Sequence, residues 1–168
     1  MNAQDDKIKE QQQLIKKLQK HNDKLQRFYD EYQRVCRNEE ERIKELDCLY
    51  RVARCVVIES NLDLALSKIV NIVPHGWQYT KYACARIVFM DKKYVSPVFF
   101  ESGANQSENI FIDNKIVGAI DIFYKPGLAS TQNSPFLIEE RNLIKGIANI
   151  ISFYVKKQRD DENGKLIQ

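Results

Sequence analysis

Apolar residues recur at alternating spacings of three and four through the first third of the chain. One heptad frame, with Ile8 at position a, fits most of residues 5–58, a stretch that contains neither Pro nor Gly. An apolar repeat of about 3.5 residues over this length predicts a left-handed coiled coil. The alternative is a single solvated helix, which would leave the apolar seam exposed to water. The expected seam consists of Ile8, Ile15, Leu18, Asn22, Leu25, Tyr29, Tyr32, Cys36, Ile43, Leu46 and Tyr50.

A polar residue interrupts this seam at Asn22. A single Asn at an a position favours two helices in one fixed register, at some cost in stability. In a parallel pair Asn22 meets its own copy. We therefore expect a parallel homodimer.

The same helix changes character after Leu46. Cys48, Val52 and Cys55 form a second apolar stripe beside the seam. A helix that is apolar on two sides is buried on two sides. We expect one side to continue the dimer seam and the other to pack on a globular domain.

A second helix follows Ser60, which we expect to cap it, with Asp63 three residues later. Pro74 and Gly76 are expected to end it. Its apolar face consists of Leu62, Ala65, Leu66, Ile69, Val70 and Val73.

Four strands are predicted next, over residues 82–90, 94–100, 108–112 and 116–124. Pro97 indicates an edge strand or a bulge, because Pro has no N–H for a ladder hydrogen bond. The triplet Asp113-Asn114-Lys115 is turn-like, so the last two strands are predicted to form a hairpin.

The last helix is expected to begin with Ser134 as N-cap and Pro135 at its first position. Its apolar stripe consists of Leu137, Ile144, Ile147, Ile151, Tyr154 and Val155. The order of elements predicts an α+β fold, in which a long coiled-coil helix precedes an antiparallel sheet with helices packed on one face.

Composition narrows the classes of partner. The net charge is +3, from 26 basic and 23 acidic residues, so nucleic acid is not expected as the main partner. No apolar run approaches the roughly 20 residues that span a bilayer, so we expect no membrane insertion and a cytoplasmic location. The four cysteines have no metal-ligand spacing, and neither a metal nor a cofactor is expected.

Three stretches of the second part carry a resemblance to a known family. They are residues 72–79 leading into 83–87, residues 114–122, and residues 134–144. Together they resemble the GAF domain family, closest to the short GAF-like input domains of sensor histidine kinases. The resemblance predicts a GAF-like domain over 46–158. The heptads before it predict a coiled-coil helix over 1–45, and the polar residues after it predict a flexible tail over 159–168.

The GAF resemblance also implies how the parts are used. It implies that the first and last helices join a dimeric helical bundle, while the other sheet face and its loops form a ligand pocket. The segment between Phe100 and Glu108 is short, although larger members build much of their pocket lid there. The Asn-Lys-Phe-Asp-Glu signature of the members that bind cyclic nucleotides is absent.

Five residues are candidates for ligand contact. Arg86 and Asp121 are charged residues within apolar strands, and three interpretations remain open: a structural ion pair, an anchor for an anionic ligand, or simple exposure. Trp77, Tyr79 and Tyr82 precede the first strand, where aromatic side chains with polar tips either line a small-molecule site or cover a sheet edge.

No set of nucleophile, base and orienting residue can be assembled from the sequence, so we expect no enzyme. The first functional interpretation is a dimeric signalling module that senses a small ligand or a protein partner and relays the change through the coiled coil. The second is a structural adaptor, in which a degenerate GAF-like domain dimerises or docks onto a larger assembly.

Overall fold

The structure is a computed structural model that describes residues 3–127 and 135–165, with side chains described for 7–127 and 135–161. The chain divides into two compact units, Met1–Glu40 and Glu41–Gln168. The long helix α1 (Ala3–Ile58) supplies the described part of the first unit and the first element of the second. The predicted long helix is therefore confirmed.

The first unit is a helix whose described side chains are almost all exposed to water. Gln and Lys are its commonest residues, and both lose little rotamer freedom in a helix. Gln26 Nε2 donates to Asp30 Oδ1 at 3.0 Å, one turn along the helix. The apolar residues of the predicted seam are mostly exposed.

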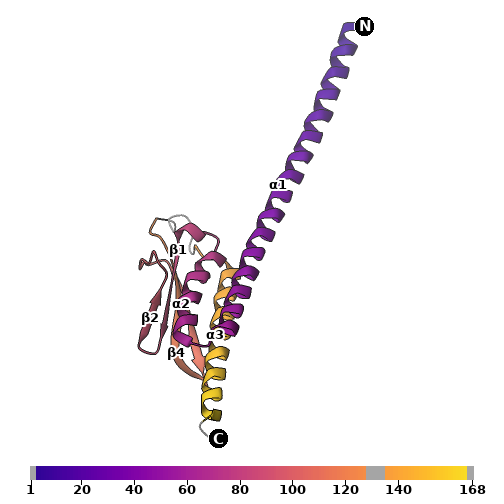
Figure 1. The fold of residues 1–168 in the computed structure, drawn as a ribbon. Coiled ribbons are helices and arrows are strands. Elements are labelled where there is room, and N and C mark those ends of the chain that lie inside the picture. The colour runs from indigo at the N-terminus through magenta and orange to yellow at the C-terminus, as the bar shows by residue number, and fades with distance from the viewer. Residues whose placement is uncertain (1–2, 128–134, 166–168) are drawn as a thin grey trace. The chain divides into compact units, whose positions relative to one another are not determined.

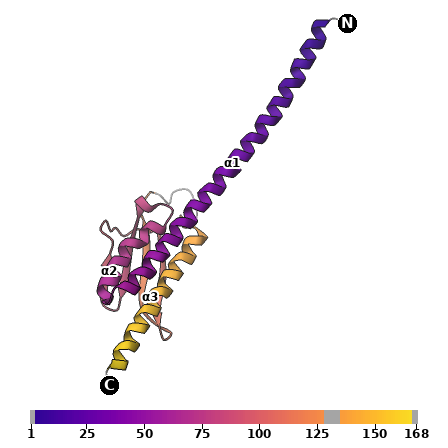
Figure 2. The same ribbon diagram turned by 45° about the vertical axis from the view of Figure 1, so that its right-hand side comes forward.

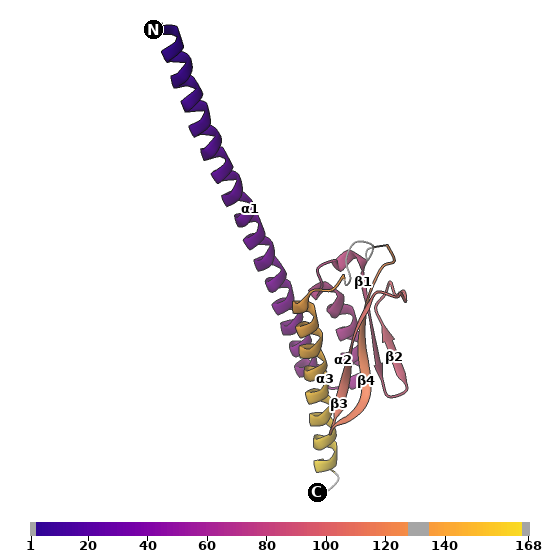
Figure 3. The same ribbon diagram turned by 180° about the vertical axis from the view of Figure 1, so that it is seen from behind.

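The described residues of the second unit add two helices, two short 3-10 turns and four strands (Figure 1). In chain order they are α2 (Leu62–Ile72), η1 (Val73–Gly76), η2 (Thr80–Tyr82), β1 (Ala83–Phe89), β2 (Lys92–Val95), β3 (Asn105–Ile112), β4 (Lys115–Tyr124) and α3 (Ile138–Lys165). The strands are antiparallel, in the order β2-β1-β4-β3, and lie side by side in Figure 3. This arrangement confirms the α+β fold.

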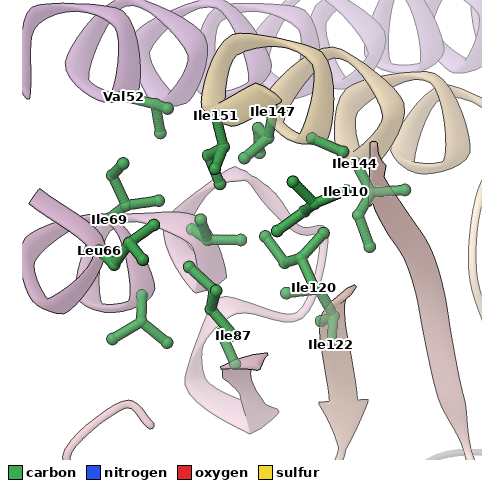
Figure 4. Close-up of a cluster of buried hydrophobic side chains, with 14 of the residues drawn as sticks. Val52, Leu66, Ile69, Ile87, Ile110, Ile120, Ile122, Ile144, Ile147 and Ile151 are labelled. Atoms are coloured by element: carbon green, nitrogen blue, oxygen red, sulfur yellow. The ribbon is translucent and has the colours of Figure 1, made fainter. Parts of the chain in front are cut away.

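Alternate strand residues build one core with the helices. Ile87 of β1 and Ile120 and Ile122 of β4 point toward the helices in Figure 4 and are fully buried. They meet Leu66 of α2 and Ile147 of α3, among others, in one hydrophobic cluster. The helices thus cover one face of the sheet, as predicted.

The last turns of α1 belong to this core and pack with α2 and α3 (Figure 2). The second apolar stripe, Cys48, Val52 and Cys55, is buried. The Cys48 thiol lies 3.8 Å from Val73 O, and the Cys55 thiol lies 3.7 Å from Ala65 O. The prediction that this side of the helix packs on the globular domain is confirmed.

Two tight turns close the hairpins. Asp113 and Asn114 have φ of 47° and 62°, the left-handed pair that a two-residue type I′ turn requires. The predicted β3–β4 hairpin is confirmed. Met90, in the β1–β2 turn, also has a positive φ of 51°, which is uncommon for a bulky residue.

The cap of α2 differs from the prediction. Asn61, and not Ser60, is the N-cap, and its side-chain oxygen accepts a hydrogen bond from Leu64 N at 3.1 Å. Both residue types suit a cap, and Asn61 has the extended backbone that the position needs, with φ −108° and ψ 123°.

Two other boundaries are also corrected. The strand predicted over 94–100 is β2, which begins at Lys92 and ends at Val95, ahead of Pro97. The last helix begins at Ile138, so Pro135 is not its first residue, and Ser134 lies outside the described residues. Leu137 precedes the helix, where its N–H donates to Glu140 Oε2 at 2.7 Å, as in a capping box.

The helix α3 continues through Lys165 and so includes most of the segment expected as a tail. Arg159 Nη2 lies 2.6 Å from Asp113 Oδ2 of the β3–β4 turn.

Within residues 3–127 and 135–165, no helix combines the length and the apolar character that crossing a membrane requires.

Candidate functional site

Arg86 and Asp121 form an ion pair on the face of the sheet opposite the helices. They are register partners on β1 and β4, and Arg86 Nε lies 2.8 Å from Asp121 Oδ2. Arg86 also pairs with Glu101 and lies over the Phe123 ring, 5.0 Å from its centroid. Burial disfavours the charged guanidinium, but the bonds to Asp121 and Glu101 outweigh it and raise the pKa of Arg86. Two carboxylates already neutralise this cation, which favours the structural interpretation.

Trp77 lies inside the core. Its side chain is 0% exposed, and its indole Nε1 donates to Gln106 Oε1 at 3.1 Å. The second amide atom, Gln106 Nε2, is buried without a hydrogen-bond partner among the described residues. Trp77 therefore joins the 3-10 turns to β3.

Tyr79 and Tyr82 remain partly exposed at the entrance to β1. The Tyr79 ring packs edge-on against Tyr124, with 5.6 Å between centroids. The Tyr82 N–H donates to Tyr79 O at 2.8 Å. The structure thus brings Arg86 and Asp121 together and places Trp77 and Tyr79 in separate contacts.

A buried carboxylate lies behind Tyr79. Glu140 is 1% exposed, and its Oε1 accepts hydrogen bonds from Gln78 N at 2.8 Å and Tyr124 Oη at 2.9 Å. Burial raises the pKa of Glu140, although these hydrogen bonds oppose the shift. Glu140 holds the start of α3 against the end of β4.

An open cavity of about 620 Å³ lies on the helix side of the sheet, where the sequence predicts no site. Its floor includes the side chains of Phe89, Val117 and Val155. Its rim comes from the α1–α2 junction, both hairpin turns and the C-terminal half of α3. Because these segments are far apart in the sequence, no local motif could have revealed it.

Ion pairs surround the cavity. Lys92 Nζ lies 2.6 Å from Asp63 Oδ2, and the bonds from Lys92 and Tyr94 lower the pKa of Asp63. Burial, followed by the Asp63 contact, raises the pKa of Tyr94 to about 12.

On the other side of the cavity, Asp113 is shared by two cations. Arg159 lies 2.6 Å and Lys156 3.5 Å from its carboxylate, and the Arg159 bond chiefly lowers the pKa of Asp113. Lys115 also lines the rim. The cations around the cavity therefore outnumber the carboxylates, which suits a small ligand with an acidic group and an apolar body.

The exposed side of α1 is the other candidate surface. In the first unit Leu18, Leu25, Tyr29 and Tyr32 are each more than half exposed. In the second unit Tyr50 of α1 and Phe153 of α3 are also exposed. Apolar side chains repeated along a helix in this way are typical of a surface that packs on another helix.

The described residues give little support for metal or thiol chemistry. No group of three or more His, Cys, Asp or Glu residues in the described part of the chain could hold a metal ion. Burial raises the pKa of Cys48 to about 12, so its reactive thiolate is disfavoured near neutral pH.

Comparison with known proteins adds no assignment to this geometry. Neither a protein-family model nor a curated protein matches the chain.

Proposed function

We propose that this chain is a non-catalytic, dimeric signalling or regulatory module of the cytoplasm. Its GAF-like domain senses a small ligand or a protein partner, and the coiled coil of α1 relays the change. The cavity described above is the ligand site in this proposal, in place of the surface around Trp77 and Arg86.

The lining of the cavity is the observation that carries this proposal. Ser60 and Asn61 connect α1 to α2, Met90 and Asp113 belong to the hairpin turns, and Val155 belongs to α3. A ligand that touches all of these segments favours one packing of the helices over another. Such a difference in affinity between two packings is what a relay requires.

The backbone of the β1–β2 turn adds support. Met90 holds a positive φ in a two-residue turn where Gly is the usual choice, and its N–H donates to Val117 O at 2.8 Å. Residues held in sparsely populated backbone regions cluster at ligand sites and switch regions.

The test begins with native mass spectrometry of the chain purified under gentle conditions. We expect a reproducible added mass on a multimer, which identifies the ligand. The identified molecule is then titrated against wild type, Val117→Phe and Val98→Phe in thermal unfolding experiments. We expect it to raise the Tm of wild type and of Val98→Phe, whose position is exposed outside the cavity, and to have no effect on Val117→Phe.

Circular dichroism checks that Val117→Phe is folded before the titration. An equal Tm increase in all three proteins would place the ligand elsewhere. The sensing proposal would be abandoned if gentle purification gave no bound mass and no partner protein.

The structural adaptor is the second candidate, and the state of the predicted pocket favours it. Trp77 is sealed in the core, and Arg86 is already paired with two carboxylates. An adaptor would appear in the same experiment as a multimer that retains another protein but no small molecule.

A further inference from the structure

A second apolar row lies beside the predicted dimer seam in the first unit of α1. In the frame that puts Ile8 at a, the g positions hold Leu14, His21, Phe28 and Val35. Leu14, Phe28 and Val35 are 57%, 71% and 49% exposed. A two-stranded coiled coil buries chiefly its a and d rows and usually carries charges at e and g.

The g row forms a complete seam with the d row. Leu14, Leu18, His21, Leu25, Phe28, Tyr32 and Val35 alternate at spacings of four and three. The d residues Leu18, Leu25 and Tyr32 therefore belong to two overlapping seams, one shared with the a row and one with the g row. A helix with apolar residues at a, d and g faces the core of a bundle of more than two helices.

The e row is neutral as well. Its residues are Gln12, Gln19, Gln26 and Gln33. Between Ile8 and Cys36, every Asp, Glu, Lys and Arg falls at b, c or f. Four of the seven heptad positions are thus free of Asp, Glu, Lys and Arg, so a wide neutral face runs the length of this segment.

This charge distribution points to further copies of the same chain as the partner. A symmetric assembly brings identical rows of neighbouring helices close together, and like charges there would repel. Neutral Gln and apolar residues avoid that repulsion. The same rows carry no charge pattern that would select a different helix by complementarity.

We propose that the segment from Ile8 to Cys36 assembles four copies of the chain, as a pair of dimers, through the a, d and g rows together. This inference rests on the self-association in the proposed function and adds the second seam to it. The a and d rows join two helices, and the g row, with its shared d residues, joins the two pairs. The b, c and f rows remain in water.

Sedimentation equilibrium of the full chain over a range of concentrations tests the proposal. For wild type we expect four times the chain mass of 19.7 kDa. Phe28→Glu combined with Val35→Glu places charges in the g row alone and is expected to give a dimer. Leu18→Glu combined with Leu25→Glu damages both seams and is expected to give a monomer.

The matched control is Arg27→Glu combined with Arg34→Glu, at neighbouring f positions. It introduces as many carboxylates as the g-row variant and is expected to remain a tetramer. The globular domain of every variant is checked through the fluorescence of Trp77, the single Trp of the chain.

The remaining outcomes separate the second seam from the self-association it rests on. A wild type that stays dimeric at all concentrations overturns the second seam and leaves the dimeric module intact. A trimer, or a g-row variant that stays tetrameric, also overturns the second seam. A monomeric wild type overturns both proposals.

Discussion

Replacing Arg86 by Met tests whether the ion pair on the open sheet face holds β1 and β4 together. The change leaves the Asp121 carboxylate, whose residue is 6% exposed, without the guanidinium 2.8 Å away. Removing one partner of a buried pair costs about 3–5 kcal/mol. Because 18% of the Arg86 side chain is exposed, we expect the lower end, about 3 kcal/mol, in the free energy of unfolding.

Removing the Asp121 carboxylate is expected to cost less stability than removing the Arg86 guanidinium. In Asp121→Asn, Arg86 keeps its contacts with Glu101 and Phe123. We therefore expect a loss of about 1.5–2 kcal/mol in the free energy of unfolding, the lower end of the range for a hydrogen bond to a charged group. The Arg86→Met, Asp121→Asn double variant should be more stable than the sum of the two losses predicts, because the unpaired carboxylate is gone.

Urea unfolding followed by Trp77 fluorescence measures all three variants, since this Trp is buried and unique. Lys81→Met, which removes an exposed cation next to β1, is the control and should change stability by less than about 0.5 kcal/mol. The reasoning is refuted if Arg86→Met is as stable as this control, or if the two single losses simply add. Either result would favour the alternative interpretation, in which Arg86 anchors an anionic ligand.

Three further predictions concern the fold. Gly118→Ala puts a Cβ 2.2 Å from Val88 O, so we expect the free energy of unfolding in urea to fall by about 3 kcal/mol or more. Gly103→Ala is the control, because open space surrounds that position, and it should leave stability nearly unchanged. Asn61→Ala removes the α2 cap and should cost about 1 kcal/mol in the same assay. Burial raises the pKa of Glu140 above its unfolded value. Wild type should therefore lose stability relative to Glu140→Gln as the pH rises from about 4.5 toward neutral. A stability difference between the two proteins that stays constant with pH would contradict that shift.

The elements set by side-chain periodicity were predictable from the sequence. The long helix follows from its heptads, and the buried stripe of Cys48 and Val52 follows from the second apolar face. The pairing of Arg86 with Asp121 was one of three open interpretations, because each charge lies within an apolar strand and needs compensation.

Features set by backbone geometry or by distant segments were not predictable. Ser60 and Asn61 both suit a helix cap, and only the structure shows that the Asn61 side chain accepts the hydrogen bond from Leu64 N. The start of α3 depends on the hydrogen bond from Leu137 N to the Glu140 side chain. The residue types Ser134 and Pro135 suggest an earlier start and give no sign of this bond. The cavity exists only because the fold brings Met90 and Val155 to one place.

The central claim is that copies of this chain associate through α1 and carry a domain that responds to a ligand or a partner. Native mass spectrometry of the gently purified full chain measures both properties at once. The account predicts a multimer with a reproducible bound mass, and a bare monomer for Leu18→Glu combined with Leu25→Glu. A wild-type chain that is monomeric and carries nothing would contradict it.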